Sequence, residues 1–270
     1  MSLNPYVEIS GSGPNLVLLH GWGLHGGIWQ TVLPLLEQHF TVHNIDLPGF
    51  GRSAVYNGDY DLSYLVDSVN QVLPQQCYLM GWSLGGLVAT AVAKKHPNKV
   101  KKLITVASSP RFIAAEDWPY GMDPLVLKSF MEYLSDDFEG TLIKFLSIQT
   151  MGSKTQKQDV AQLKNTVFIH GLPAKKALTG GLQILQDTNL LEDLANLSTP
   201  LLRIYGKLDT LVPVKSAKLV SDIVPESASM IFNQSGHAPF LSESENFTNT
   251  VAEFLLQIVP CIRSRVLEKL

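Results

Sequence analysis

Short apolar runs alternate with helix-like patterns along most of the chain. Each run has four or five residues, and together they are 16–19, 41–45, 77–80, 103–107, 201–205 and 229–232. Between them, apolar residues recur at helical spacing, as in Leu62, Leu65, Val66 and Val69, and again in Leu84, Leu87, Val88 and Ala91. Strands that alternate with helices predict a largely parallel central sheet with helices on both faces.

This alternation is interrupted once, between about residues 111 and 190. Helical patterns continue there, but no apolar run resembles a strand. We therefore expect a core formed by residues 1–110 and 191–270, with a helical lid inserted at residues 111–190.

Polar residues lie in the short segments after four of the predicted strands. They are His20 in the segment His20-Gly21-Trp22-Gly23, Ser83, Asp209 and His237. Open parallel sheets bind ligands at the carboxyl ends of their strands, so these four positions are expected to meet at one edge. Ser83 lies in G-W-S-L-G, which matches the G-x-S-x-G pattern of a nucleophile on a strand-to-helix turn.

The order Ser83, Asp209, His237 along the chain is that of nucleophile, acid and base in α/β-hydrolases. Each residue alone has an ordinary explanation: a tight turn, a loop aspartate or a surface histidine. All three after strands, in this order, predict an α/β-hydrolase fold with a helical lid and a catalytic triad.

The expected roles follow from chemistry. A serine hydroxyl attacks only when an imidazole takes its proton, and a buried carboxylate orients that imidazole. Ser83 would attack, His237 would act as base and then acid, and Asp209 would orient His237. The backbone N–H groups of Trp22 and Leu84 would form the oxyanion hole. We expect His20 to support the Trp22 loop rather than act as a second base.

Composition narrows the setting. The chain has 270 residues, 45% hydrophobic, with a net charge of -3, which gives no basic field for nucleic acid. No apolar run approaches the roughly 18 residues that would span a membrane, and no signal peptide is evident. The two cysteines, Cys77 and Cys261, are expected to be reduced thiols rather than a disulfide. We expect a cytoplasmic monomer that needs no cofactor. We also expect no metal site, because the spacings typical of metal ligands are missing.

Several longer segments together resemble one family. LVLLHGWG, DLPGFGRS, GWSLGGLVA, TVASSP, QTMG, YGKLDTLVP and HAPF are similar to the pimeloyl-acyl-carrier-protein methyl ester carboxylesterases of biotin synthesis. The resemblance spans about residues 14 to 258. It implies hydrolysis of the methyl ester on a carrier-bound pimeloyl chain. It places Ser83, Asp209, His237, Trp22 and Leu84 on the catalytic and oxyanion positions, and Trp22 and Phe145 on substrate-contacting positions.

Charge in the predicted lid suggests where an acidic carrier protein would dock. From Lys144 to Lys176 there are six lysines and one acid, whereas residues 111–139 hold two basic residues and seven acids. A basic face steers an acidic partner, and Lys144, Lys157 and Lys164 are the candidate contacts. A solvated helix face would have the same composition. The family's lid is richer in arginine, and this chain has Gly140 and Ala161 where basic residues are expected.

Other functions use the same residues. A lipase or general carboxylesterase, a carbon-carbon bond hydrolase and a cofactor-free haloperoxidase all fit the triad, whereas a haloalkane dehalogenase would need a carboxylate at position 83. A hydrolase-like receptor of small molecules would also fit. The tail at residues 260–270 extends beyond the resemblance and is expected to be a short helix or a disordered end.

Overall fold

In the computed structural model, seven strands form one sheet in the order β1-β3-β2-β4-β5-β6-β7. The structure describes residues 4–55, 58–149 and 156–257. The strands are β1 (Val7–Gly11), β2 (Asn15–Leu19), β3 (Thr41–Ile45), β4 (Cys77–Trp82), β5 (Val100–Val106), β6 (Leu201–Gly206) and β7 (Ala228–Phe232). β1 pairs antiparallel with β3, and every other neighbouring pair is parallel.

The six apolar runs correspond to β2 through β7, so the prediction of a mostly parallel sheet is confirmed. The sequence missed β1. Its residues are exposed or half-buried, because it is an edge strand with one neighbour, and its sequence VEISG contains no continuous apolar run. The central strand β2, by contrast, has four consecutive residues, 16–19, that are completely buried.

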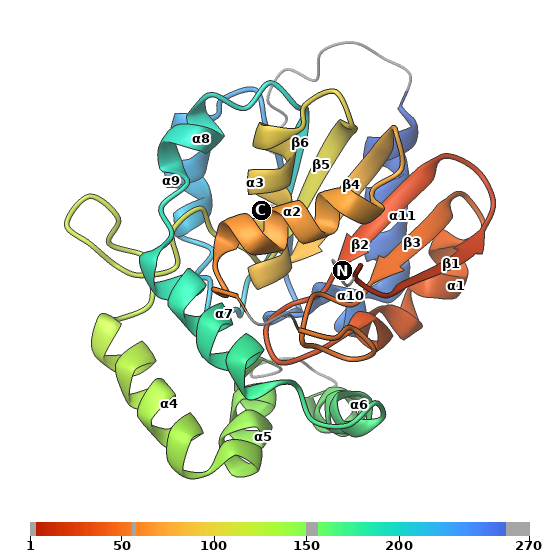
Figure 1. The fold of residues 1–270 in the computed structure, drawn as a ribbon. Coiled ribbons are helices and arrows are strands. Elements are labelled where there is room, and N and C mark those ends of the chain that lie inside the picture. Colours follow the sequence, from red (N-terminus) through yellow and green to blue (C-terminus); the bar gives the residue numbers. More distant parts are fainter. Residues whose placement is uncertain (1–3, 56–57, 150–155, 258–270) are drawn as a thin grey trace.

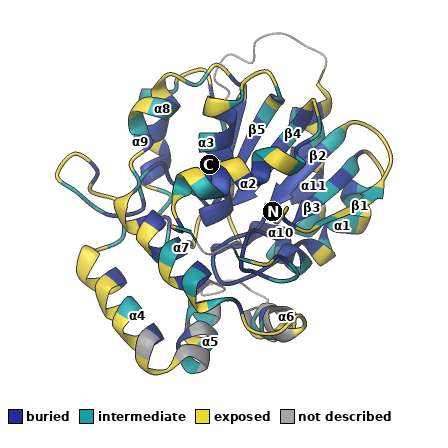
Figure 2. Ribbon diagram, in the orientation of Figure 1, coloured by how far each residue is buried: buried dark blue, intermediate teal, exposed yellow. Residues whose placement is uncertain are grey.

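Helices cover both faces of the sheet. Figure 1 shows α2 and α3 on one face and α11 on the other. The helices outside the segment between β5 and β6 are η1 (Gly26–Thr31, a 3-10 helix), α1 (Leu33–Leu36), α2 (Leu62–Val72), α3 (Leu84–Lys95), α9 (Ser216–Ile223), α10 (Pro239–Ser242) and α11 (Ser244–Leu256). Their inner sides and the central strands form the buried core seen in Figure 2.

In its described part, the segment between β5 and β6 has helices joined by loops and no named strand, and two isolated bridges lie in the loop before the first helix. It contains α4 (Pro124–Asp136), α5 (Phe138–Gln149), α6 (Gln156–Phe168), α7 (Lys175–Asp187) and α8 (Leu191–Ala195). α4 packs on α5 and α7, and α5 packs on α6, which gives a helical layer beside the sheet (Figure 1). The division into core and lid at residues 111–190 stays a prediction.

Two sequence expectations lie outside the described residues: the tail at 260–270, and residues 150–152 of the QTMG segment. Across the described ranges, no helix combines the length and the apolar character needed to cross a bilayer.

Candidate active site

Ser83 occupies a sharp turn between β4 and α3. Its backbone has φ 55° and ψ -118°, a left-handed value of φ that non-glycine residues rarely adopt. The glycines on either side allow the turn to pack tightly. A Cβ on Gly81 would collide with the backbone of Gly85, and a Cβ on Gly85 would lie 2.5 Å from the carbonyl oxygen of Leu19. The G-x-S-x-G pattern therefore forms the strained strand-to-helix turn that presents a serine above a sheet.

Asp209 and His237 form a buried pair. His237 Nδ1 lies 2.8 Å from Asp209 Oδ2, and both side chains are almost completely inaccessible to solvent. The other carboxylate oxygen, Oδ1, accepts hydrogen bonds from the backbone N–H groups of Leu211 at 2.8 Å and Val212 at 3.0 Å. The loop after β6 therefore fixes the carboxylate, and the carboxylate in turn fixes the imidazole ring.

The second imidazole nitrogen is the one available for proton transfer. His237 Nε2 is buried and has no hydrogen-bond partner among the described residues. Trp82 connects the histidine loop to the serine turn, because its Nε1 donates to the His237 carbonyl at 2.7 Å. Ser83 and His237 make no hydrogen bond in the described part of the structure, and such bonds often tighten only when substrate is bound.

The loop after β2 passes across the serine turn. A Cβ on Gly21 would lie 3.3 Å from the Ser83 Cβ and 2.9 Å from the Trp82 ring, so only glycine allows this approach. The adjacent Trp22 and the first residue of α3, Leu84, both meet α7. A Cβ on Gly181 would lie 2.7 Å from Trp22 Cδ1 and 3.5 Å from Leu84 Cδ2. The two predicted oxyanion residues are therefore neighbours.

Phe145 belongs to an aromatic cluster that joins the β5–β6 segment to Trp22. The ring centroid of Phe145 lies 5.0 Å from that of Trp22 and 5.2 Å from that of Phe130, and Trp22 lies 5.4 Å from Phe130. Trp22 Nε1 also donates to the Leu178 carbonyl of α7 at 2.9 Å. Residues of α4, α5 and α7 thus surround one tryptophan, which leaves Phe145 half-buried and beside the predicted oxyanion loop.

His20 has both ring nitrogens occupied. Its Nε2 accepts a hydrogen bond from the Leu47 N–H at 2.8 Å, so Nδ1 carries the proton and donates to the Gly21 carbonyl at 2.8 Å. Burial lowers the pKa of His20 to about 4, despite the nearby Asp46 carboxylate, which raises it. A neutral imidazole with a hydrogen bond at each nitrogen supports the loop and has no free nitrogen for catalysis.

The lowered pKa of His20 predicts acid-dependent instability. The unfolded chain takes up this proton near the ordinary pKa of 6.5, whereas the folded protein takes it up only near pH 4. The free energy of unfolding should therefore fall as the pH drops from 6.5 to about 4, by up to about 3 kcal/mol. Urea unfolding of the wild-type protein and of His20→Gln at several pH values measures this.

His20→Gln should lose that part of the pH slope even if it is less stable at pH 7. The pKa values of His43 and His96 are also lowered by burial, but both are present in both proteins and cancel in the comparison. Parallel slopes for the two proteins would contradict the assignment of this effect to His20.

Asp46 is a site-supporting residue that the sequence reasoning did not single out. Its carboxylate accepts from the Gly26 N–H at 2.7 Å and from Arg52, through the backbone N–H at 3.0 Å and Nε at 2.9 Å. Burial alone would raise the pKa of Asp46, but these hydrogen bonds and nearby His20 hold it below the ordinary value. Its position in the segment DLPGFGRS was the available signal.

The described residues contain no group of three or more histidine, cysteine, aspartate or glutamate side chains arranged to hold a metal ion. Cys77 is a free, buried thiol, and burial raises its pKa to about 12. It is therefore protonated at neutral pH and is a poor nucleophile.

The candidate docking lysines lie on two adjoining helices. Lys144 is exposed on α5, Lys157 is exposed on α6, and Lys164 is half-buried on α6. Because α5 packs on α6, the three positions belong to the same helical layer. Lys154 lies outside the described residues.

Comparison with known proteins places this geometry in a family. The α/β hydrolase fold family matches residues 14–244. The chain is 46% identical over 254 residues to a pimeloyl-acyl-carrier-protein methyl ester esterase of Vibrio campbellii, covering 94% of this chain and 99% of the relative. It is 47% identical over 253 residues to the esterase of the same name from Yersinia enterocolitica, covering 93% and 97%.

A solved structure shows the same architecture. An esterase from Exiguobacterium antarcticum superimposes with a TM-score of 0.86 at 26% sequence identity, covering 94% of this chain and 96% of that one. The residues that match the α/β hydrolase fold family, 14–244, include the serine turn and the loops that hold Asp209 and His237. The chain belongs to the α/β-hydrolase family and, within it, to the family of pimeloyl-acyl-carrier-protein methyl ester esterases.

Proposed function

We propose that this chain is a serine carboxylesterase that hydrolyses the methyl ester of pimeloyl-acyl-carrier protein in biotin synthesis. The observation that carries the chemistry is the buried Asp209–His237 pair beside the strained Ser83 turn. The substrate is inferred from two relatives at 46% and 47% identity whose names specify it. We propose that the protein works as a monomer in the cytoplasm, without cofactor, metal or nucleic acid.

The reaction would have two stages. Ser83 Oγ attacks the ester carbonyl while His237 Nε2 takes the hydroxyl proton, and Asp209 stabilises the charged imidazole. His237 then gives that proton to the departing methoxide, which leaves as methanol, and the acyl group stays bound to Ser83 as an acyl-enzyme. Water, deprotonated by His237, attacks the acyl-enzyme, and Ser83 recovers its proton as the pimeloyl carboxylate departs. The backbone N–H groups of Leu84 and Trp22 would stabilise the oxyanion in both stages.

The aromatic cluster suggests how the acyl chain would be held. Trp22, Phe130 and Phe145 present apolar rings next to the predicted oxyanion loop. Burial of methylene groups against such rings contributes about 0.8 kcal/mol for each CH₂. We therefore propose that Trp22 and Phe145 contact the pimeloyl chain.

An acidic carrier protein would dock on the lysines of α5 and α6. Changing Lys144, Lys157 and Lys164 together to glutamate should lower kcat/KM for the carrier-bound ester by about tenfold or more, because steering charges act on encounter. Turnover of a small free methyl ester should stay within about twofold, since none of these lysines belongs to the triad. Steady-state kinetics with the two substrates, at salt concentrations below and above about 0.1 M, measures this.

A matched control uses lysines near the amino ends of the strands, on the side of the sheet away from Ser83. Lys94 and Lys95 lie at the carboxyl end of α3, and Lys101 lies near the start of β5, whereas Ser83 precedes the amino end of α3. Reversing these three changes the net charge equally and should leave both substrates unaffected. If the α5–α6 variant loses activity on both substrates alike, the lysines support the fold of the helices rather than docking.

The decisive test of the whole proposal is biological. A bacterium that lacks this esterase requires biotin, and expression of the wild-type chain should restore growth without it. Expression of Ser83→Ala at equal level should fail to do so. If neither protein restores growth, the natural substrate is a different ester.

A general short-chain carboxylesterase is the second candidate. The structural similarity to the Exiguobacterium antarcticum esterase, with a TM-score of 0.86, favours this alternative. A panel of carrier-bound pimeloyl methyl ester, free pimeloyl methyl ester, short aryl esters and triglycerides separates the two functions. A carbon-carbon bond hydrolase would be inactive on all of them, and a receptor would show near-single turnover.

A further inference from the structure

The last residue of β5 and the two residues after it form a short segment that contacts the Ser83 backbone on both sides. The Val106 carbonyl accepts the Ser83 N–H at 2.9 Å, and the Ser108 hydroxyl donates to the Ser83 carbonyl at 2.8 Å. Ala107 lies between these two contacts, with φ 43°. Residues 106–108, which we call the β5 clamp, therefore contact both polar groups of the Ser83 backbone.

The clamp is itself strained, which suggests a requirement for its shape. Within the described ranges, Ser83 and Ala107 are the two non-glycine residues with positive φ. They follow Trp82 and Val106, which are paired neighbours in β4 and β5. The Ala107 N–H donates to the Ile204 carbonyl of β6 at 2.8 Å, which anchors the clamp. Such conformations cost about 1–3 kcal/mol each and persist only where the surroundings enforce them.

The contact with the Ser83 carbonyl has a consequence for the oxyanion hole. The Ser83 carbonyl and the Leu84 N–H belong to one planar trans peptide, so they point in opposite directions. The carbonyl accepts from the Ser108 hydroxyl and from the N–H groups of Gly86 at 2.9 Å and Leu87 at 3.2 Å. These three donors set the plane of the peptide, and they thereby aim the Leu84 N–H away from α3.

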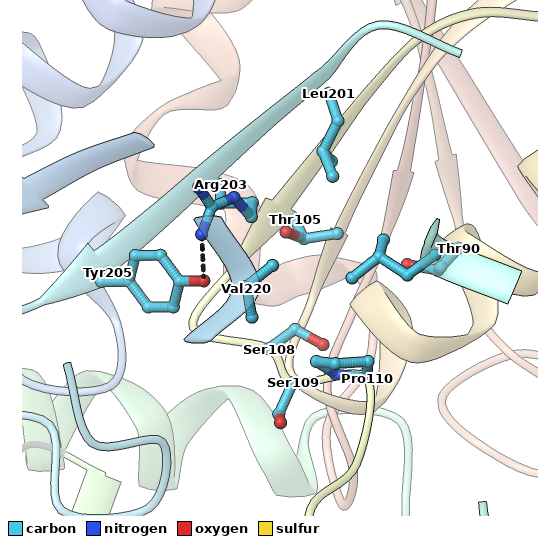
Figure 3. A pocket seen from close by; sticks show the side chains of 10 residues that line it. Thr90, Thr105, Ser108, Ser109, Pro110, Leu201, Arg203, Tyr205 and Val220 are labelled. Atoms are coloured by element: carbon cyan, nitrogen blue, oxygen red, sulfur yellow. Dashed lines mark hydrogen bonds between the residues drawn. The ribbon is translucent and has the colours of Figure 1, made fainter. Parts of the chain in front are cut away.

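Ser108 is the side-chain donor in this set, and its surroundings keep it in place. Ser108 is 7% exposed, and a Cβ on Gly86 would lie only 2.5 Å from the Ser108 Cβ, so the serine lies against the first turn of α3. Ser108 lines a small cavity together with Thr105 and Ser109, and Figure 3 shows Ser108 next to Ser109 and Pro110. The cavity volume is about 10 Å³, which is close to the minimum for one water molecule.

We propose that Ser108 is a positioning residue that orients the Ser83–Leu84 peptide, and with it the oxyanion-stabilising Leu84 N–H, through its hydrogen bond to the Ser83 carbonyl. The inference rests on the proposed function, because it assumes that Ser83 is the nucleophile. It predicts an effect on the chemical step rather than on substrate binding.

The test compares kcat and KM for a small free ester across four variants. Ser108→Ala should lower kcat about tenfold, as expected for a lost buried hydrogen bond of about 1.4 kcal/mol, with KM unchanged. In Ser108→Ala, a water molecule in the nearby cavity could replace the lost hydroxyl as donor, so a second comparison between two variants is needed. Ser108→Thr and Ser108→Val have the same shape and differ in the hydroxyl, so Thr should retain much more kcat than Val.

Ser109→Ala is the matched control. Ser109 is 8% exposed, but its hydroxyl donates to the Arg111 carbonyl at 2.5 Å and not to Ser83. Its kcat should equal that of the wild-type protein. The rate at which a fluorophosphonate labels Ser83 should follow kcat across all the variants, since labelling also places developing charge in the oxyanion hole.

The outcomes separate this inference from the proposed function. If the wild-type protein neither hydrolyses esters nor is labelled at Ser83, both are overturned. If it does, but Ser108→Ala and Ser109→Ala have equal kcat, or Thr and Val have equal kcat at equal melting temperatures, the positioning role is overturned and the esterase proposal stands.

Discussion

Ser83→Ala is expected to abolish ester hydrolysis while leaving the fold intact. Loss of the serine nucleophile in a comparable protease costs about 2 × 10⁶ in kcat, and the residual activity comes from the oxyanion hole and binding. The Ser83 backbone makes its contacts with Val106, Gly86 and Ser108 through groups that alanine retains. The melting temperature should therefore stay close to that of the wild-type protein.

Covalent labelling checks the same residue without a substrate. A fluorophosphonate or sulfonyl fluoride should label Ser83 alone, as read by mass spectrometry of a digest. The label should vanish in His237→Ala, because the hydroxyl then has no base. Activity of Ser83→Ala within tenfold of the wild-type value would refute the nucleophile assignment.

Asp209→Asn is expected to have the second-largest effect, and the geometry gives the reason. Two backbone N–H groups, from Leu211 and Val212, hold Oδ1 in place. In the variant the amide oxygen must occupy that position, so the amide NH₂ faces His237 Nδ1. That nitrogen must then be unprotonated, and the proton moves to Nε2, where it blocks removal of the Ser83 proton. The same substitution in a serine protease costs about 10⁴ in kcat.

Two nearby aspartates provide controls for that experiment. Asp187 is exposed at the end of α7 and accepts from the Gln183 side chain at 2.7 Å, and Asp193 is half-buried on α8. Asp187→Asn and Asp193→Asn should be nearly silent in kcat. A loss at either position equal to that of Asp209→Asn would show that the triad acid has been misplaced.

Most of the sheet was predictable because burial leaves a direct mark on sequence. A strand with neighbours on both sides and helices on both faces needs apolar residues at every position, as in residues 16–19. β1 escaped prediction because it is an edge strand that is exposed or half-buried along its length. Its side chains do not have to be apolar, so its pattern does not differ from that of a loop.

The positions of Ser83, Asp209 and His237 could be predicted because each follows a strand, and parallel strands end at a common edge. The supporting contacts could not. The segment DLPGFGRS contains Asp46, but no local pattern specifies that its carboxylate accepts hydrogen bonds from Gly26 and Arg52. The Trp22–Phe130–Phe145 cluster joins segments more than a hundred residues apart in sequence. Ser108 and Ser109 are adjacent serines, and no sequence pattern distinguishes their roles, yet the structure places the Ser108 hydroxyl on the Ser83 carbonyl and the Ser109 hydroxyl on the Arg111 carbonyl.

The sequence by itself determined the alternation of strands and helices, the glycine-flanked serine turn and the order of the candidate triad, because these depend on local periodicity and backbone sterics. The tertiary structure decided which side chains meet. It brought His237 Nδ1 within 2.8 Å of Asp209, occupied both nitrogens of His20 and placed Ser108 against the Ser83 peptide. Such contacts depend on the order β2-β4-β5-β6 in the sheet, which sets distances that no local pattern encodes.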